Sequence, residues 1–290
     1  MKQISHRRWI QFLSTILSNS YMGSIYTKTV SNNTLKGICV PFLNCYSCPT
    51  ALFACPIGTL QHFMTIHMIP YYLLGFLSVV GMTIGRMACG WVCPFGYFQD
   101  MMFKLSEKHY SVPYYLKYTK YFVLLLFVFI LPYITGEMWF SKLCPAGTLT
   151  AGIPWSIWNP VNPSNGHHLL SNPPGIMFYS SLLVLFACCA WFIVSKRPFC
   201  RVICPMGAFF AMFNNFSLIR LEIDKTCDNC SVCQQNCPVD LNVAVDVGSG
   251  ECIRCLDCTR CEHVHLVSEF KSFQGISREN TEQSVKLGKE

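Results

Sequence analysis

The sequence predicts an all-α polytopic membrane domain with four transmembrane helices and a two-fold internal repeat, followed by a small, cysteine-rich α+β domain. Three observations predict this fold class. The 290 residues are 52% hydrophobic and only 13% charged, a composition typical of membrane proteins. A Cys-Pro-x-Gly tetrapeptide occurs four times beside apolar segments. Cysteines separated by two residues are concentrated in a segment near the C-terminal end. A secreted disulfide scaffold is excluded, because such scaffolds are short chains that lack spanning helices.

The first expected span runs from Trp9 to about Tyr26 and follows a basic start at Lys2, Arg7 and Arg8. A basic start with a short apolar core is also typical of a cleavable signal peptide. No clear small-x-small cleavage site follows, so we favour a span that the mature protein retains.

Three further apolar segments are each about long enough to cross a hydrocarbon layer of ~30 Å as a helix. They cover residues 71–88, 119–134 and 176–195.

The distribution of basic residues predicts the orientation of these spans, because Lys and Arg stay on the cytoplasmic side. The N-terminus, the 86–120 loop and the start of the tail carry most of them: Lys2, Arg7, Arg8, Arg86, Lys104, Lys108, Lys117, Lys120, Lys196, Arg197 and Arg201. The opposite loops carry Lys28, Lys36 and Lys142. Four spans with both termini in the cytoplasm satisfy this pattern, which places the protein in the cytoplasmic (inner) membrane of the cell.

The composition changes at about Ser217, which divides the chain into a membrane domain (1–216), a cytoplasmic domain (217–271) and a polar tail (272–290) expected to be disordered. Residues 218–224 alternate between apolar and polar side chains, a pattern that predicts a short strand.

The cytoplasmic domain contains two strings of four cysteines: Cys227, Cys230, Cys233 and Cys237, then Cys252, Cys255, Cys258 and Cys261. The first string, with Pro238 after its last cysteine, has the spacing of bacterial ferredoxins, in which the fourth cysteine binds the other cluster. Cross-ligation would give one [4Fe–4S] cluster on Cys227, Cys230, Cys233 and Cys261, and another on Cys252, Cys255, Cys258 and Cys237. Structural zinc is the alternative. The second string lacks the usual ending, so His263 or His265 could replace Cys261.

The four Cys-Pro turns form two matched pairs, and this is the basis of the predicted repeat. Proline after the cysteine favours the first position of a helix, whose amide groups then point at an anionic centre. Four cysteines on each side of the membrane are enough for one [4Fe–4S] cluster. We assign an inner cluster to Cys89, Cys93, Cys200 and Cys204, and an outer cluster to Cys45, Cys48, Cys55 and Cys144.

The outer cysteines admit a second interpretation. Thiols on the oxidising face can form disulfides, and Cys45 and Cys48 have the spacing of a redox Cys-x-x-Cys pair. Cys39 could replace any outer ligand. A transmembrane thiol or metal reductase, or a maturation factor for a partner metalloenzyme, is therefore the alternative function.

The segments Cys89–Gln99, Cys200–Gly207 and Cys227–Cys261 resemble those of polytopic membrane 4Fe–4S proteins of the NapH type and of the nitrous-oxide-reductase-regulator type. Arg7, Arg8 and Gln11 are also similar to residues of that family. The resemblance implies four spans, cytoplasmic ferredoxin clusters, and exchange of electrons with the quinone pool or an extracytoplasmic reductase. The Asn44–Cys55 segment departs from the basic family pattern and puts the quinone role in doubt.

The expected function is electron transfer in the membrane between a cytoplasmic or quinone donor or acceptor and an extracytoplasmic redox partner. No nucleophile–base pair occurs in the sequence, so no catalytic residue is assigned and an electron carrier or quinol-dehydrogenase-like subunit is favoured over a stand-alone enzyme. The basic residues flank apolar segments instead of forming a stripe, so nucleic acid is not an expected partner.

Overall fold

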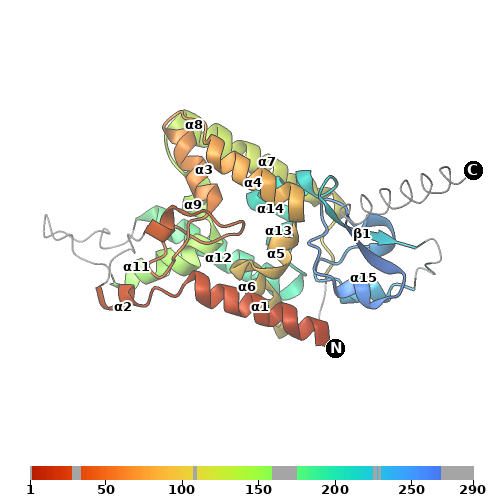
Figure 1. Cartoon of the computed structure of the whole chain (residues 1–290). Coiled ribbons are helices and arrows are strands. Elements are labelled where there is room, and N and C mark those ends of the chain that lie inside the picture. The colour runs from red at the N-terminus through yellow and green to blue at the C-terminus, as the bar shows by residue number, and fades with distance from the viewer. Residues whose placement is uncertain are drawn as a thin grey trace, which may run out of the picture.

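The computed structural model describes residues 2–27, 34–106, 110–158, 175–224, 227 and 230–268. This part of the chain is mostly helical, and its two-stranded sheet lies at one end of the molecule (Figure 1). The polar tail expected at 272–290 lies outside the described residues.

The N-terminal segment forms the helices α1 (Lys2–Ser18) and α2 (Gly23–Thr27) and the short turn η1 (Thr34–Gly37). The side chain of Asn19 donates to the carbonyl of Thr15 (3.1 Å) at the point where α1 ends. The expected first span, from Trp9 to about Tyr26, is therefore interrupted, and α1 is not among the described helices of membrane-spanning length.

Two described helices are long and apolar enough to cross a membrane: Tyr114–Thr135 and Ile176–Val194. The second is α12, and the first joins η3 (Tyr114–Tyr118), α7 (Thr119–Val123), the π-helical η4 (Leu124–Ile130) and α8 (Leu131–Thr135). The apolar helix α4 (Tyr71–Ile84) has 14 residues and a length of about 21 Å. Two of the four expected spans thus reach membrane-spanning length as single helices.

Short helices flank these spans, and a proline starts the helix after each Cys-Pro turn. Cys55, Cys93, Cys144 and Cys204 cap the helices α3 (Pro56–Thr65), α6 (Pro94–Met102), α10 (Pro145–Gly147) and α14 (Pro205–Phe213). The predicted role of these prolines is confirmed. The other flanking elements are α5 (Met87–Trp91), η2 (Phe103–Leu105), α9 (Trp139–Leu143), η5 (Thr148–Gly152), α11 (Ile153–Trp158) and α13 (Pro198–Val202).

The C-terminal segment contains the strands β1 (Ile219–Ile223) and β2 (Val264–Ser268), which pair antiparallel with Leu221 opposite Leu266. The strand predicted at 218–224 is confirmed. Between the strands lie α15 (Val232–Asn236), α16 (Val243–Asp246) and η6 (Asp257–Arg260).

The loop before η6 packs directly on the helical part of the molecule. A Cβ atom at Gly90 would lie 2.5 Å from the carbonyl oxygen of Ile253, so only glycine allows this approach. The side chain of Trp91 donates to the carbonyl of Arg254 (3.0 Å). The side chain of Asn214 donates to the carbonyl of Cys252 (3.0 Å). The second cysteine string is therefore fixed against α5 and α14.

Candidate metal centres

All nineteen cysteines are free thiols, and the predicted ligands gather in separate parts of the described chain. One group lies where α5, α6, α13 and α14 meet. A second lies around α3, α9 and α10, in the part of the helical region that is far from the two-stranded sheet. The remaining groups lie beside the two-stranded sheet (Figure 1).

Two arginines join the two motifs of the inner group, the one that contains Cys89 and the one that contains Cys200. Arg86, three residues before Cys89, donates from Nη2 to the carbonyl of Cys200 (2.9 Å). Arg197, three residues before Cys200, donates from Nη1 to the carbonyl of Cys89 (3.0 Å). Both arginine side chains are almost fully buried. The arginine before each inner motif is therefore hydrogen-bonded to the first cysteine of the other inner motif.

Glycine makes these crossings possible. A Cβ atom at Gly207 would lie 2.9 Å from the carbonyl oxygen of Cys200 and 3.1 Å from Nη2 of Arg86. A Cβ atom at Gly96 would lie 3.2 Å from Nη1 of Arg197. The glycine of the Cys-Pro-x-Gly turn thus leaves room for the arginine of the other half.

Two donors point at inner sulfur atoms. The side-chain amide of Gln99 donates to Sγ of Cys200 (3.1 Å), and the backbone amide of Gly207 donates to Sγ of Cys204 (3.3 Å). Burial raises the pKa of the Cys93 thiol to about 12, and the pKa values of Cys89 and Cys204 are also raised by burial. Soft, buried sulfur donors surrounded by N–H groups and cationic side chains fit an anionic thiolate-bound centre.

The matching glutamine of the outer group has a different role. Oε1 of Gln61 accepts from the backbone amides of Phe140 (3.1 Å) and Ser141 (3.4 Å), in the first turn of α9. Gln61 also donates to the hydroxyl of Ser141 (3.0 Å). Gln61 and Gln99 both lie three residues after the glycine of their motif, yet Gln99 donates to sulfur whereas Gln61 caps the first turn of α9.

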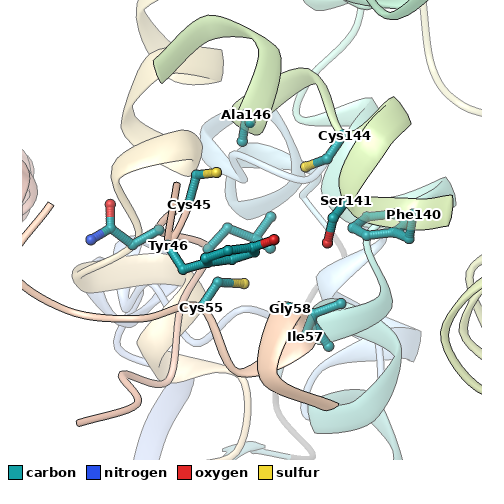
Figure 2. Close-up of a pocket in the computed structure, with 12 residues that line it drawn as sticks. Cys45, Tyr46, Cys55, Ile57, Gly58, Phe140, Ser141, Cys144 and Ala146 are labelled. Carbon is teal, nitrogen blue, oxygen red and sulfur yellow. The ribbon is translucent and has the colours of Figure 1, made fainter. Parts of the chain in front are cut away.

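Three of the four predicted outer ligands line one cavity. Figure 2 shows the thiols of Cys45, Cys55 and Cys144 around it, with the ring of Tyr46 among the lining side chains. A Cβ atom at Gly147 would lie 3.5 Å from Sγ of Cys45. Burial raises the pKa of the Cys45 and Cys144 thiols to about 12.

The fourth predicted outer ligand, Cys48, is buried but does not line this cavity. Its Sγ lies 3.3 Å from the hydroxyl of Thr50 and 3.7 Å from Oδ1 of Asn19. Cys39 is also outside the lining, and its Sγ lies 3.6 Å from the hydroxyl of Thr59. The loop that carries Cys48 is held by Trp155, whose ring N–H donates to the carbonyl of Ser47 (2.8 Å).

The first cluster set predicted for the cytoplasmic domain gathers around a single cavity. This cavity is lined by all four cysteines of the set, Cys227, Cys230, Cys233 and Cys261. His263 lines the same cavity, whereas His265 lies 3.1 Å from the carboxylate of Asp224 and is exposed. The position of Cys261 agrees with the predicted cross-ligation.

The second predicted set is more deeply placed. Cys237, Cys252 and Cys255 are buried, and Cys258 is partly buried. Burial raises the pKa of Cys258 to about 12, and the nearby thiols of Cys252 and Cys237 raise it further. Cys237, from the first string, therefore lies near the cysteines of the second string.

Within the described ranges, no three His, Cys, Asp or Glu side chains converge as ligands of one metal ion. A structural zinc ion needs four donors at about 2.0–2.3 Å from one point. In a [4Fe–4S] cluster, each of the four thiolates binds a different iron atom. Thiolates spread around a cavity are therefore compatible with a cluster.

Comparison with known proteins bears on the same motifs. The family model described as "4Fe-4S binding domain" matches residues 53–68, 66–113 and 177–223. These ranges include Cys55, Cys89, Cys93, Cys200 and Cys204. Over these segments the chain is similar to 4Fe–4S binding domains. The match covers the Cys-Pro turns at Cys55, Cys93 and Cys204 and most of the apolar helices α4 and α12, but not the turn at Cys144 or the helix Tyr114–Thr135.

Several curated proteins are similar to the chain. An uncharacterized protein of Methanocaldococcus jannaschii is 27% identical over 221 residues, covering 72% of this chain and 83% of that protein. The regulatory protein NosR of Stutzerimonas stutzeri is 27% identical over 188 residues, covering 60% of this chain and 23% of NosR. The putative electron transport protein YccM of Escherichia coli is 23% identical over 219 residues, covering 67% of this chain and 53% of YccM. No solved structure matches the chain.

These similarities confirm the predicted resemblance to ferredoxin-type membrane proteins as a distant homology. The chain spans only a quarter to a half of NosR and YccM.

The sequence does not indicate the ion pairs that lie beside the inner group. Lys120 and Arg86 both pair with the carboxylate of Glu251, and Arg86 lies 3.5 Å from it. Arg197 makes a two-pronged pair with Asp100 at 2.6 and 2.5 Å. The sequence feature that could indicate these pairs is an arginine three residues before the first cysteine of each inner motif. The charge pattern alone indicates only the cytoplasmic side of the membrane for these arginines.

Proposed function

We propose that this chain is a membrane-bound iron–sulfur electron-transfer protein. It passes electrons between a cytoplasmic or quinone donor or acceptor and an extracytoplasmic redox partner. The observation that carries the proposal is the gathering of cysteines from distant parts of the chain: Cys89 and Cys200 are held by arginines from opposite halves at 3.0 and 2.9 Å. The homology to 4Fe–4S proteins supports the same conclusion.

We assign four [4Fe–4S] clusters to the cysteine groups. The ligand sets are Cys227, Cys230, Cys233 and Cys261; Cys252, Cys255, Cys258 and Cys237; Cys89, Cys93, Cys200 and Cys204; and Cys45, Cys48, Cys55 and Cys144. When bound, such clusters accept and release single electrons at potentials set by charge, hydrogen bonds and solvent exposure. The first cytoplasmic cysteine string has the spacing of ferredoxins, the second lacks the usual ending, and the outer set depends on Cys48 approaching its cavity.

The residues of the chain prepare the inner group for this role. Gln99 and Gly207 donate to sulfur, while Arg86 and Arg197 place positive charge beside the thiols. The packing of Gly90 on Ile253 brings the cytoplasmic cysteine string close to α5. These contacts would keep water away and fix the groups relative to one another.

We further propose four spans, with both termini in the cytoplasm and the membrane domain ending near residue 216. In addition to the two helices of membrane-spanning length, α1 and α4 present exposed apolar side chains. On α1 these are Trp9, Leu13, Ile16 and Leu17, and on α4 they include Val79 and Met82. Exposed apolar surfaces of this kind are typical of lipid contacts. Residues 217–271 would then form the cytoplasmic domain.

A vesicle assay tests the proposal. The holoprotein is reconstituted anaerobically into sealed vesicles that contain ferricyanide, and dithionite, which does not cross the bilayer, is added outside. We expect the trapped ferricyanide to be reduced at a rate proportional to the amount of protein. Cys89→Ala should abolish this reduction, and Cys189→Ala, a change in a thiol assigned to no cluster, should leave it intact.

If wild-type vesicles reduce trapped ferricyanide no faster than protein-free vesicles, although iron and sulfide remain bound, electron transfer across the membrane is excluded.

A further inference from the structure

A cationic cavity lies beside the inner group, between α1, α6 and the cytoplasmic cysteine segment. Its lining contains five basic side chains and two carboxylates. The charged residues are Arg7, Arg8, Lys104, Lys196, Arg197, Asp100 and Asp257.

The guanidinium group of Arg7 is the least satisfied member of this lining. Arg7 is 4% exposed, and its Nη2 lies 3.3 Å from Asp257. Its Nε and Nη1 atoms are buried and have no hydrogen-bond partner. Leaving buried donors unpaired destabilises the folded state, and the effect is larger for charged groups. An acceptor in the cavity would remove this destabilisation.

The nearby carboxylates are already engaged. Asp100 accepts two hydrogen bonds from Arg197, at 2.6 and 2.5 Å. Asp257 faces Arg7. The ammonium of Lys196 donates to the carbonyl of Gln235 (2.9 Å) and lies 3.8 Å from the carboxylate of Asp240, which is not part of the lining. The cavity therefore keeps an excess of positive charge after its internal pairs are counted.

We propose that this cavity binds the phosphate group of a monoester or diester. The fork of N–H groups on arginine matches phosphate oxygens, and clustered Lys and Arg residues attract anionic headgroups at the cytoplasmic surface of a membrane. Two sources share this chemistry: the headgroup of an anionic phospholipid and a soluble phosphate. In the first case the lipid would join α1 to the cysteine-rich segment at the membrane surface.

The test uses the full-length holoprotein. Native mass spectrometry measures retention of phosphatidylglycerol against phosphatidylcholine after reconstitution in mixed vesicles, and calorimetry measures binding of inorganic phosphate. Arg8→Gln/Lys104→Gln changes two exposed side chains of the lining, and Lys142→Gln removes an exposed cation at the other end of the molecule. Arg7→Gln is the second variant, and its iron content reports whether it folds.

We expect the wild-type protein and Lys142→Gln to bind one of the two probes, and the double variant to bind it about tenfold or more weakly. Retention of phosphatidylglycerol identifies a lipid, and binding of inorganic phosphate alone identifies a soluble source. Failure of both probes to bind, or equal binding by all variants, overturns the proposal. If Arg7→Gln shifts a cluster potential but leaves binding of both probes unchanged, the cations only balance cluster charge and the proposal is wrong.

Discussion

Arg197 donates a hydrogen bond of 3.0 Å to the carbonyl of Cys89, a residue 108 positions earlier in the chain. The reciprocal bond joins Arg86 to Cys200. The two inner motifs are therefore locked together by residues that lie outside the Cys-Pro-x-Gly pattern. Both arginines also place a buried positive charge beside the expected thiolates.

Replacing Arg197 tests the effect of this charge. Arg197→Gln removes a buried cation near the inner group, and we expect the reduction potential of one cluster to fall because the reduced, more negative state loses stabilisation. Arg197→Lys keeps the charge but not the two-pronged contact with Asp100, so its potential should fall less. Potentiometric EPR measures both.

Lys142→Gln is the control for this comparison, since Lys142 pairs with Glu137 on the surface. Equal potentials in Arg197→Gln and wild type, with all iron retained, would show that the arginine acts only as a structural brace.

The inner ligand set predicts a specific pattern of iron loss. Cys89→Ala and Cys200→Ala should each lose about four iron atoms per chain, because each removes a ligand of the same cluster. The double variant should lose no more than either single variant. Cys188→Ala, a buried thiol of α12 that we assign to packing, should retain all its iron. Additive losses in the double variant would place Cys89 and Cys200 on different clusters.

The identity of the fourth outer ligand can be decided by two substitutions. We expect Cys48→Ala to lose about four iron atoms per chain and Cys39→Ala to lose none. Iron analysis of the two purified variants gives the answer directly. The reverse result would assign Cys39 to the outer cluster and leave Cys48 with its observed contacts to Thr50 and Asn19.

Glu251 balances two buried cations, Arg86 and Lys120, whose side chains are 0% exposed. Glu251→Gln should destabilise the protein by about 3–5 kcal/mol, because it leaves buried charges without a counter-ion. Glu137→Gln breaks an exposed pair with Lys142 and should cost about 0–1 kcal/mol. Thermal unfolding in one detergent compares the two, and equal shifts would contradict the structural role of Glu251.

The local features of the fold could be predicted from the sequence because they depend on neighbouring residues. Pro56, Pro94, Pro145 and Pro205 start helices as expected, since proline fits the first helical position. The alternation of apolar and polar side chains at 218–224 likewise predicted β1, because it depends only on neighbouring residues. The gathering of Cys227, Cys230, Cys233 and Cys261 around one cavity also agrees with their spacing.

Contacts between distant residues could not be predicted in this way. Nothing near Arg86 in the sequence indicates that its partner is the carbonyl of Cys200. Gln61 and Gln99 occupy equivalent positions in their motifs but have different partners, Ser141 and Cys200, because α9 lies beside only one of them. The first expected span also continues past Ser18, although Asn19, Ser20 and Tyr21 interrupt the apolar run just after the point where α1 ends.

The most direct test of the account is the iron and acid-labile sulfide content of anaerobically purified protein, with EPR of the reduced state. Four clusters predict about sixteen iron and about sixteen sulfide per chain. About eight of each, with all iron lost when the cysteines from Cys227 to Cys261 are replaced, would contradict the inner and outer clusters. The chain would then be a ferredoxin attached to a membrane anchor.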